Sequence, residues 1–430
     1  MNAYFYTLGC KVNQYETQAM MRLLEEQGYN VAEYIPGSAD AGEAVIVINS
    51  CTVTGESDRK LRQLLRRCRR ENPQAILVLT GCMPQAFPAI AADFGEVDIV
   101  LGNAARKSLP AQLGRFLASG ARIVEIPDHD RTFESLDIDA FQGRTRAFVK
   151  IEDGCNRFCS YCIIPYARGR VRSRSLGELN AELCRLADNG YTEVVLVGIN
   201  LTAYGQDNGT NICDAVECAC AVEGIHRVRL GSIEPDHMTP DIIARLARCD
   251  KLCPQFHLAL QSGCDATLKR MNRHYTTEQY RQVCQQLRQA FPGCALTTDV
   301  MVGFPGETQE EFEQSLSFVR EIGFSRLHCF AYSRRAGTLA AKAPDQVPNA
   351  EKMRRNRRMI ALGEESRNAY AESLIGKTVS VLLETEQADG TAHGYTDTYV
   401  PVVVANARTG QTVSVCIERC ADGVCYGVAE

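Results

Sequence analysis

Three cysteines between residues 155 and 162 are the side chains of this sequence best suited to chemistry. Cys155, Cys159 and Cys162, here the loop cysteines, lie in the run CNRFCSYC, and no fourth ligand follows at a matching distance. A closed zinc site needs four protein ligands, whereas an iron–sulfur cubane held by three thiolates leaves one iron open. Because the run is polar and follows Gly154, three unrelated core cysteines are the weaker alternative. The C-x3-C-x2-C spacing predicts a [4Fe-4S] cluster with one free coordination position.

A second set of three cysteines is defined by its place behind predicted strands. Cys10, Cys51 and Cys82, here the sheet cysteines, each come two residues after a short apolar run; these runs are Ala3–Leu8, Ala44–Asn49 and Ala75–Thr80. Ligands of open parallel sheets bind at the carboxyl ends of the strands, and neighbouring strands lie about 4.8 Å apart. We therefore expect these thiols to converge on another cluster with an open iron. The alternative is that they are small buried hydrophobes, as free cysteines usually are.

Glycines and small polar residues follow the predicted strands in the middle of the chain. Glycine lets a backbone approach a ligand closely, and Ser, Asn, Gln and Glu can bond ribose hydroxyls, adenine edges or an ammonium group. Turn-forming residues are common after strands, so no single position is specific. Together, downstream of the loop cysteines, they predict a pocket for an adenosine-like ligand. The candidate pocket residues are Gly198, Asn200, Ser232, Glu234, Gln261, Ser262 and Gly303.

The elements around the sheet cysteines predict an α/β domain. Residues 1–126 alternate short β-branched strands with helices such as Glu16–Gln27, which predicts an open parallel sheet. The strands are apolar throughout, as expected of a sheet that is buried on both faces. Residues 127–146 are polar and irregular, and we interpret them as a linker.

Residues 147–372 repeat the alternation of strands and helices. The predicted strands are Ala147–Ile151, Glu193–Val197, Arg227–Leu230, Gln255–Leu258, Leu296–Met301 and Arg326–Phe330, and the clearest helices are Leu176–Asn189, Thr276–Ala290, Gln309–Glu321 and Asn349–Glu372. Six βα units predict a partial barrel, because a full barrel needs eight, and barrel active sites lie at the carboxyl ends of the strands.

Residues 376–430 show a different pattern, with short strands separated by glycines. The predicted strands are Thr378–Glu384, Tyr399–Val404, Gln411–Ile417 and Cys425–Val428. Strands of this length with turns between them predict a small β-barrel.

Composition limits the compartment and the class of the protein. The chain has 430 residues, a formal net charge of −5 and 45% hydrophobic residues, which are ordinary values for a globular protein. No apolar run approaches the roughly 18 residues of a membrane span, and the first residues lack the features of a signal peptide. We therefore expect a cytoplasmic protein with no membrane partner. In such a protein, twenty cysteines indicate metal or redox chemistry more often than disulfides.

Basic residues are clustered although the chain as a whole is acidic. Arg59–Arg70 contains seven Lys or Arg and no acid, and its leucines have a helical spacing that leaves the basic side outward. The other clusters are the alternating Arg168, Arg170, Arg172 and Arg174, and the segment Met353–Arg358. Solvated faces are the alternative, but three clusters, two of them beside the cysteines, favour a nucleic-acid phosphate backbone as partner. Residues 376–430 have three basic against seven acidic residues, so charge gives no argument for RNA binding there.

Along essentially its whole length the chain resembles the radical S-adenosylmethionine (SAM) methylthiotransferases. The order of the three parts carries the resemblance together with both cysteine sets, since C-x3-C-x2-C is the radical SAM signature. The motifs LGCKVNQYE (8–16), NSCTVT (49–54) and CIIPYARG (162–169) are similar to one branch in particular. That branch adds a methylthio group to carbon 2 of N6-threonylcarbamoyladenosine beside the tRNA anticodon. The last part resembles a TRAM domain.

The resemblance implies a transferase with two [4Fe-4S] clusters, SAM and tRNA. The loop cysteines would hold the cluster that takes an electron from a reducing donor and cleaves SAM to a 5′-deoxyadenosyl radical. The sheet cysteines would hold an auxiliary cluster that presents methylated sulfur, the methyl coming from another SAM. TRAM domains in this family contribute to substrate binding.

Several other functions stay open. Two further branches of the family modify isopentenyladenosine in tRNA or an aspartate of a ribosomal protein, and their sequences around the first cysteine usually differ from Lys11-Val12-Asn13. A non-catalytic iron–sulfur electron carrier is an alternative from another class, although such a carrier normally closes its cluster with four ligands. A zinc-dependent RNA-binding module is a third.

Overall fold

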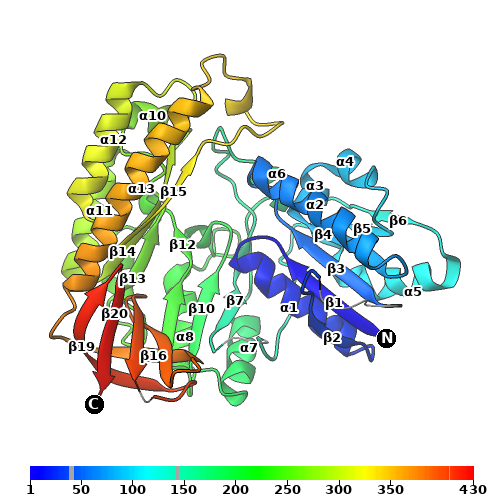
Figure 1. Cartoon of the computed structure of the whole chain (residues 1–430), viewed down its shortest axis with the longest axis horizontal. Coiled ribbons are helices and arrows are strands. Elements are labelled where there is room, and N and C mark those ends of the chain that lie inside the picture. The colour runs from blue at the N-terminus through cyan, green and yellow to red at the C-terminus, as the bar shows by residue number, and fades with distance from the viewer. Residues whose placement is uncertain (38–42, 142–144, 406) are drawn as a thin grey trace.

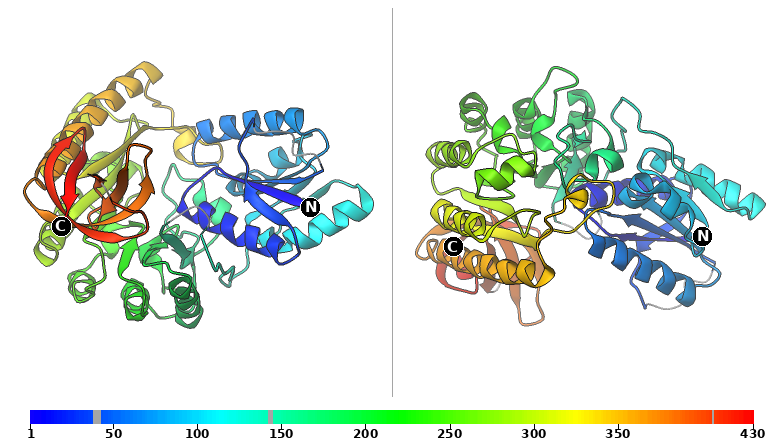
Figure 2. Two further views of the ribbon diagram at one scale, coloured as in Figure 1. Left: turned by 60° about the horizontal axis from the view of Figure 1, so that its bottom comes forward. Right: turned by 90° about the horizontal axis from the view of Figure 1, so that it is seen from above.

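The computed structural model describes residues 1–37, 43–141, 145–405 and 407–430. An N-terminal domain lies beside a larger central domain, and a small C-terminal barrel packs against the end of the central domain (Figure 1). Figure 2 shows the same three bodies from two further directions, with the carboxyl ends of the N-terminal strands pointing toward the central domain. None of the helices that the structure describes is long and apolar enough to cross a membrane.

The N-terminal domain is a six-stranded sheet with the order β2-β1-β3-β4-β5-β6, in which every pairing is parallel. Its strands are β1 (Asn2–Thr7), β2 (Asn30–Glu33), β3 (Val45–Ser50), β4 (Ile76–Gly81), β5 (Ile99–Leu101) and β6 (Ile123–Glu125). All residues of β3 and β4 are buried, because helices cover both faces of the sheet. The helices are α1 (Lys11–Glu25), α2 (Gly55–Glu71), α3 (Cys82–Ala86), α4 (Pro88–Ala92) and α5 (Leu109–Ser119).

Helix α2 shows why these residues form these elements. Thr54 caps its first turn by accepting a hydrogen bond from the Ser57 amide, and acidic residues in that turn suit the helix dipole. Its buried side chains are Leu61, Leu64, Leu65 and Cys68, which recur at helical spacing and pack against the sheet. The basic residues between them face outward, as the sequence predicts.

The central domain is a curved sheet of parallel strands with helices on its outer side (Figure 1). The strands are β7 (Ala147–Lys150), β10 (Glu193–Val197), β11 (Arg227–Leu230), β12 (Ser232–Ile233), β13 (Gln255–Leu258), β14 (Ala295–Val302) and β15 (Arg326–Ala331), and the pair β8 (Glu152–Asp153) and β9 (Arg172–Ser173) stands apart. Because β12 continues the line of β11, the sheet has the six strand positions of the predicted partial barrel.

The helices of the central domain follow their strands in βα order. They are α6 (Ile164–Arg168), α7 (Leu176–Asp188), α8 (Ile212–Ala221), α9 (Pro240–Leu246), α10 (Asp265–Arg270), α11 (Thr277–Ala290), α12 (Gln309–Ile322) and α13 (Asn349–Glu372). Helices α11 and α12 both begin with a capping box, which matches the sequence-predicted starts closely. The segment 127–146 has no helix or strand among its described residues, yet Leu136, Ile138 and Phe141 are buried in the central core.

The C-terminal body is a closed five-stranded barrel with the order β16-β17-β18-β20-β19. Its strands are β16 (Thr378–Glu386), β17 (Thr391–Thr396), β18 (Pro401–Ala405), β19 (Thr412–Ala421) and β20 (Val424–Ala429). It docks on the central domain through Arg229, whose guanidinium donates to the Thr396 and Asp397 carbonyls at 2.7 and 2.6 Å. The fold class predicted from the sequence is therefore confirmed in all three parts, although β17 was not among the predicted strands.

A buried group of charged side chains joins the N-terminal and central domains. Glu16 of α1 accepts hydrogen bonds or ion pairs from Arg106 at 2.8 Å, Lys150 at 2.8 Å and Arg168 at 3.0 Å. Lys150 also pairs with Asp153 at 2.6 Å. All five are at most 2% exposed, so they are out of contact with solvent. Although burial opposes ionisation, Arg106, Arg168 and Lys150 lower the pKa of Glu16 to about 2.

This network corrects one expectation from the sequence. Arg168, Arg172 and Arg174 are buried, and only Arg170 of the four alternating arginines is exposed. Arg168 belongs to the network, and Arg174 pairs with Glu182 at 2.7 Å. The prediction that these four arginines form an outward phosphate-binding row was wrong, because their partners are acids from elements far apart in the sequence. In Met353–Arg358, Arg355 is likewise buried, against Glu307.

We predict that Glu16→Ala lowers the free energy of unfolding by about 3–5 kcal/mol, because it leaves several buried cations without their shared carboxylate. The matched control is Glu26→Ala, which removes an exposed ion pair with Arg22 on the same helix and should cost less than about 0.5 kcal/mol. The free energy of the first unfolding transition in urea, followed by circular dichroism, measures the loss for both variants. Equal losses for the two variants would contradict the role of the network.

Candidate active site

The loop cysteines follow β8 and precede α6. Gly154, directly before them, has φ +92°, and a Cβ there would lie 2.0 Å from the Arg170 carbonyl oxygen, so only glycine fits. The Cys155 amide donates to the Gly169 carbonyl at 3.0 Å, and the Cys162 amide donates to the Cys159 carbonyl at 2.9 Å. These bonds fold the run into a compact turn with the three thiols on it.

The turn is held by the opposite side of the barrel. The Ser160 amide donates to the Met271 carbonyl at 3.0 Å, and its hydroxyl donates to the Arg270 carbonyl at 2.8 Å. The Ser160 carbonyl in turn accepts from the Ala340 amide at 2.8 Å. The loop is therefore fixed by backbone from segments 110 to 180 residues away in the chain.

The surroundings of these thiols suit a metal cluster more than free thiolates. Burial, followed by the Cys159 sulfur, raises the pKa of Cys162 to about 12, and burial raises that of Cys155 to about 11. The Arg273 guanidinium donates to the Cys159 Sγ at 3.4 Å, and Asn200 Nδ2 lies 3.9 Å from the Cys155 Sγ. Donors aimed at sulfur are the outer-shell partners that iron–sulfur ligands use.

Arg273 is a site residue that sequence reasoning missed. It is buried, and besides the Cys159 sulfur it pairs with Glu234, one of the candidate pocket residues. Glu234 is therefore already neutralised by a cation. The only signal for Arg273 in the sequence is an arginine that follows a short helix, and such a signal is not specific for a site residue.

The sheet cysteines meet at the carboxyl edge of the N-terminal sheet. Cys10 follows β1 and caps α1, Cys51 follows β3, and Cys82 begins α3 directly after β4. Burial, followed by the neighbouring Cys82, raises the pKa of Cys51 to about 12, and Cys10 acts on it in the same direction. The Arg168 Nε donates to the Cys82 Sγ at 3.2 Å, so a residue of the central domain contacts this set.

Both sets fit clusters by the chemistry of their donors. Among the described residues no three His, Cys, Asp or Glu side chains are grouped as ligands of a single metal ion. The thiolates of a cubane each bind a different iron, so they stand farther apart than the ligands of one ion. Each set consists of three thiols with a guanidinium donor at one sulfur, which suits an anionic iron–sulfur cluster.

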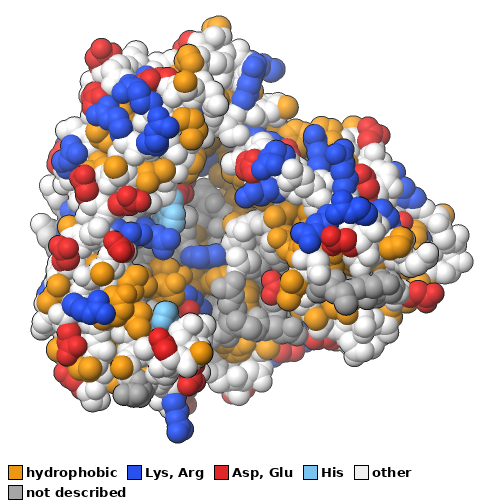
Figure 3. All heavy atoms as spheres, viewed as in Figure 1, with side chains coloured by type: hydrophobic (Ala, Val, Ile, Leu, Met, Phe, Trp, Pro, Cys, Tyr) orange, Lys and Arg blue, Asp and Glu red, His pale blue; other side chains and the backbone are white. Residues whose placement is uncertain are grey.

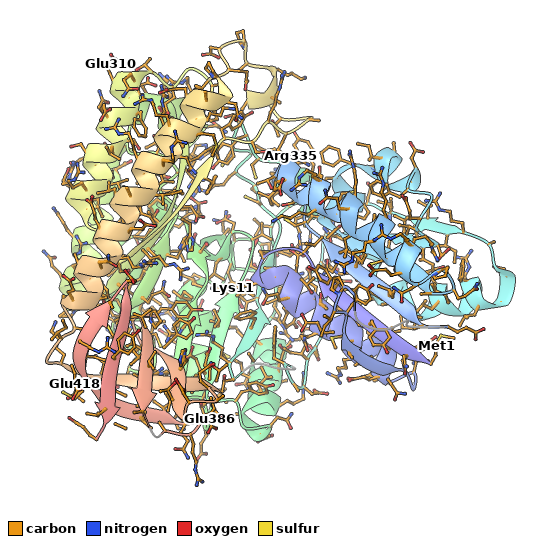
Figure 4. All side chains as sticks on the ribbon, viewed as in Figure 1. Met1, Lys11, Glu310, Arg335, Glu386 and Glu418 are labelled. Atoms are coloured by element: carbon orange, nitrogen blue, oxygen red, sulfur yellow. The ribbon has the colours of Figure 1, made fainter. Side chains whose placement is uncertain are left out.

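A cavity of about 660 Å³ lies between the two domains and runs into the barrel. Cys10 and Lys11 line it from the N-terminal domain, and Gly198 and Ser232 line it from the carboxyl ends of the barrel strands. Figure 4 shows the labelled Lys11 at the end of α1 that faces the central domain. This volume is within the usual range for small-molecule sites and is large enough for a nucleoside.

Polar side chains line the barrel interior, and the sequence analysis did not single them out. Alternate residues of one strand face the same side, so β13, β14 and β15 each present polar residues inward. These are Gln255, His257, Thr297, Asp299, Arg326 and His328. Polar residues at every second position of an otherwise buried strand are the signal that could have revealed them.

His257 contacts Asp299 and Thr297 in the cavity, and the His328 ring lies beside the His257 ring. His257 Nε2 lies 3.3 Å from Asp299 Oδ2, and His257 Nδ1 lies 3.0 Å from the Thr297 hydroxyl. Although burial opposes ionisation, the hydrogen bond with His257 lowers the pKa of Asp299. Burial, with smaller effects of the nearby His257, Arg326 and Lys11, lowers the pKa of His328, which favours its neutral form.

The candidate pocket residues divide by position. Gly198 and Ser232 line the cavity, and Asn200 lies between Gly198 and the Cys155 sulfur. The other members have local roles: the Ser262 hydroxyl accepts from the Cys264 amide at 3.3 Å, and a Cβ on Gly303 would meet Lys352. Gln261 has φ +65° and a buried side-chain oxygen without a partner among the described residues.

Comparison with known families agrees with this arrangement. Residues 149–319 match the Radical SAM superfamily, residues 2–102 match the Uncharacterized protein family UPF0004, and residues 372–429 match the TRAM domain. A solved radical SAM methyltransferase, TsrM from Kitasatospora setae, shares the fold with a TM-score of 0.58 at 15% identity, over 79% of this chain and 77% of that one. The barrel and its cysteine loop thus define a radical SAM enzyme.

Curated relatives identify the family within that superfamily. The threonylcarbamoyladenosine tRNA methylthiotransferase MtaB of Bacillus subtilis is 41% identical over 93% of this chain and 89% of its own length. MtaB of Thermotoga maritima is 36% identical over 95% and 92%. The tRNA-2-methylthio-N(6)-dimethylallyladenosine synthase of Clostridium botulinum is 37% identical over 88% and 85%. The chain belongs to the radical SAM methylthiotransferase family.

We predict that Gly154→Ala lowers SAM cleavage on the order of 100-fold, because the added Cβ collides with the Arg170 carbonyl and moves the cysteine loop. Gly177→Ala is the control, since that glycine lies in α7 with no atom within 4 Å of the added carbon. Formation of 5′-deoxyadenosine by the anaerobic protein with dithionite measures the effect. If the two variants cleave SAM equally, the loop does not depend on this glycine.

Proposed function

We propose that the protein is a tRNA methylthiotransferase that adds a methylthio group to carbon 2 of N6-threonylcarbamoyladenosine next to the anticodon. One observation carries the proposal: a single cavity is lined by Cys10 on one side and by Gly198 and Ser232 on the other. A base held there has a sulfur-delivery site on one side and a SAM site on the other. The relatives named MtaB support the choice of substrate.

The three parts of the chain divide this work. Residues 1–126 hold the auxiliary [4Fe-4S] cluster on the sheet cysteines, residues 127–146 connect the domains, and residues 147–372 hold the SAM-cleaving [4Fe-4S] cluster on the loop cysteines. Residues 376–430 form the TRAM-like barrel. The protein is cytoplasmic in this proposal, where its tRNA is found.

The overall reaction replaces the C2–H bond of adenine with a C2–S bond. When bound, the clusters would supply electron transfer to SAM and the transferred sulfur, with the electron coming from a low-potential donor. The first SAM would release methionine and carry away the C2 hydrogen as 5′-deoxyadenosine, a second SAM would provide the methyl group, and the electron left when the C2–S bond forms would return to the auxiliary cluster. The protein's own residues bind and orient. Gly198 lets backbone approach the nucleoside of SAM, Asn200 and Arg273 donate toward the cysteine sulfurs, and the barrel wall excludes water.

The outward side of α2 is the proposed contact for the tRNA phosphate backbone. Figure 3 shows Lys and Arg side chains gathered on the N-terminal domain where Figure 1 places α2. Arg59, Arg62 and Arg66 line one surface hollow there. Arg59 pairs with Glu56 and Arg66 pairs with Glu96, and the adjacent Arg67 pairs with Glu71. The patch is therefore weaker than its composition implies. Phosphate contacts position an RNA without reading its sequence.

We predict different losses from replacing the two cysteine sets with alanine. The loop triple variant should lose SAM cleavage and about half of the bound iron, because one of two cubanes has no ligands. The sheet triple variant should still form 5′-deoxyadenosine but not thiolate RNA. Cys184→Ala, an exposed cysteine on α7, is the control and should match the wild type. Unchanged iron in the loop variant, or full thiolation by the sheet variant, would refute the assignment.

We predict that deleting the gene removes methylthio-N6-threonylcarbamoyladenosine from digested tRNA, as measured by mass spectrometry. Re-expression of the chain should restore it, and re-expression of the loop triple variant should not. Loss of methylthio-isopentenyladenosine instead would assign the protein to the branch that modifies isopentenyladenosine. The Clostridium botulinum relative is named for that activity. If neither nucleoside changes, a ribosomal-protein substrate or a non-catalytic electron carrier gains support.

A further inference from the structure

Two cations that have no acidic partner in the described part of the chain line the cavity. Lys11 and Arg326 both line it, and both side chains are accessible. No ion pair joins either of them to a carboxylate among the described residues, although most arginines of this protein are paired. A cation in a concave, partly desolvated site without a counter-ion attracts an anionic ligand.

The other charged groups of the cavity are already matched. Arg229 pairs with Glu193 at 2.7 Å and donates to two carbonyls of the C-terminal barrel. Asp299 pairs with His257 at 3.3 Å. The cavity therefore keeps an excess of positive charge, contributed by Lys11 and Arg326.

The two cations reach the cavity from different domains, Lys11 from the start of α1 and Arg326 from the start of β15. Arg326, His328 and Phe330 are alternate residues of β15, so all three point inward together. Lys11 and Arg326 both line the cavity that contains the His328 ring, and both act electrostatically on it. The His328 ring lies 5.8 Å from the His257 ring, between centroids, so the two imidazoles lie side by side in the cavity.

We propose that Lys11 and Arg326 bind a carboxylate carried by the substituent on the target adenine. This inference rests on the proposed function, because the threonylcarbamoyl group ends in a carboxylate. Guanidinium groups hold carboxylates through two parallel hydrogen bonds, and an ammonium adds a point charge. The two residues are thus specificity-determining residues for an acidic N6 substituent.

The same cations disfavour an apolar substituent. An isopentenyl group would cover Lys11 and Arg326 without compensating their charge, and a buried polar group left without a partner is costly. Discrimination by an unmatched polar site is stronger than discrimination by the fit of an apolar group. The cavity therefore selects between the two kinds of modified adenosine through charge.

The experiment compares two synthetic anticodon stem-loop RNAs that differ in one charge. One carries N6-threonylcarbamoyladenosine and the other carries its methyl ester, and kcat/KM for methylthiolation is measured with the full cluster-loaded chain. We expect the wild type to prefer the acid by about 10- to 100-fold. Arg326→Gln and Lys11→Met should reduce that ratio toward one, chiefly by raising KM for the acid.

Charge-conserving and distant variants complete the test. Arg326→Lys and Lys11→Arg should keep most of the preference for the acid, and Lys269→Met, an exposed lysine on α10, should keep all of it. A folding defect lowers both rates together and leaves the ratio unchanged, so the ratio separates binding from folding. If Arg326→Gln gives no product, the comparison of Arg326→Lys with the wild type decides.

The outcomes separate the inference from the function on which it rests. A wild type that thiolates the acid but shows no preference over the ester, or variants that retain the wild-type ratio, would overturn the inference and leave the function standing. A wild type that thiolates only isopentenyladenosine RNA would overturn the proposed function, and with it this role of Lys11 and Arg326.

Discussion

The arrangement of the whole molecule depends on the buried contact of Arg168 with two domains. Its guanidinium pairs with Glu16 of the N-terminal domain and lies 3.5 Å from Asp153, and its Nε donates to the Cys82 sulfur. Asp153 itself comes two residues before Cys155. Buried ions are tolerated only when each has its partners, so a shift of one domain would leave several charges uncompensated. One side chain thus ties the position of the sheet cysteines to that of the loop cysteines.

The barrel interior combines stability with an open site. Its inward positions are polar around the cavity, whereas the strands' outward residues form one continuous apolar core with the surrounding helices. A partial barrel of six strands leaves room at its open side, where Cys10 and the C-terminal barrel close the space. The small barrel contributes Tyr399, whose ring stacks on Tyr395 and lies under the guanidiniums of Arg146 and Arg229. Docking this barrel therefore completes the wall of the cavity.

Much of this fold could be predicted from local patterns. Strands such as Glu193–Val197 and helices such as Asn349–Glu372 were predicted with the boundaries that the structure shows, because local composition marks where such elements begin and end. Helix α1 starts at Lys11, five residues before the predicted start at Glu16. The predicted start was too late because the first turn of the helix is mostly polar. The burial of Arg168 and its ion pairs could not be predicted, because its partners are brought to it by tertiary contacts between two domains. Local charge spacing carries no information about such partners.

The same reasoning explains why the positions of the cysteines could be predicted and most of the cavity wall could not. A cluster ligand must present a thiol at a loop or strand end, so spacing and position reveal it. A cavity wall is assembled from single inward residues on several strands, and each is unremarkable alone: Lys11 follows a cysteine, and Arg326 opens a strand. Their meaning comes from what they lack among the described residues, which is a carboxylate partner, whereas the buried cations of this protein are paired. Unmatched positive charge that faces a cavity is therefore the feature through which this structure adds to its sequence.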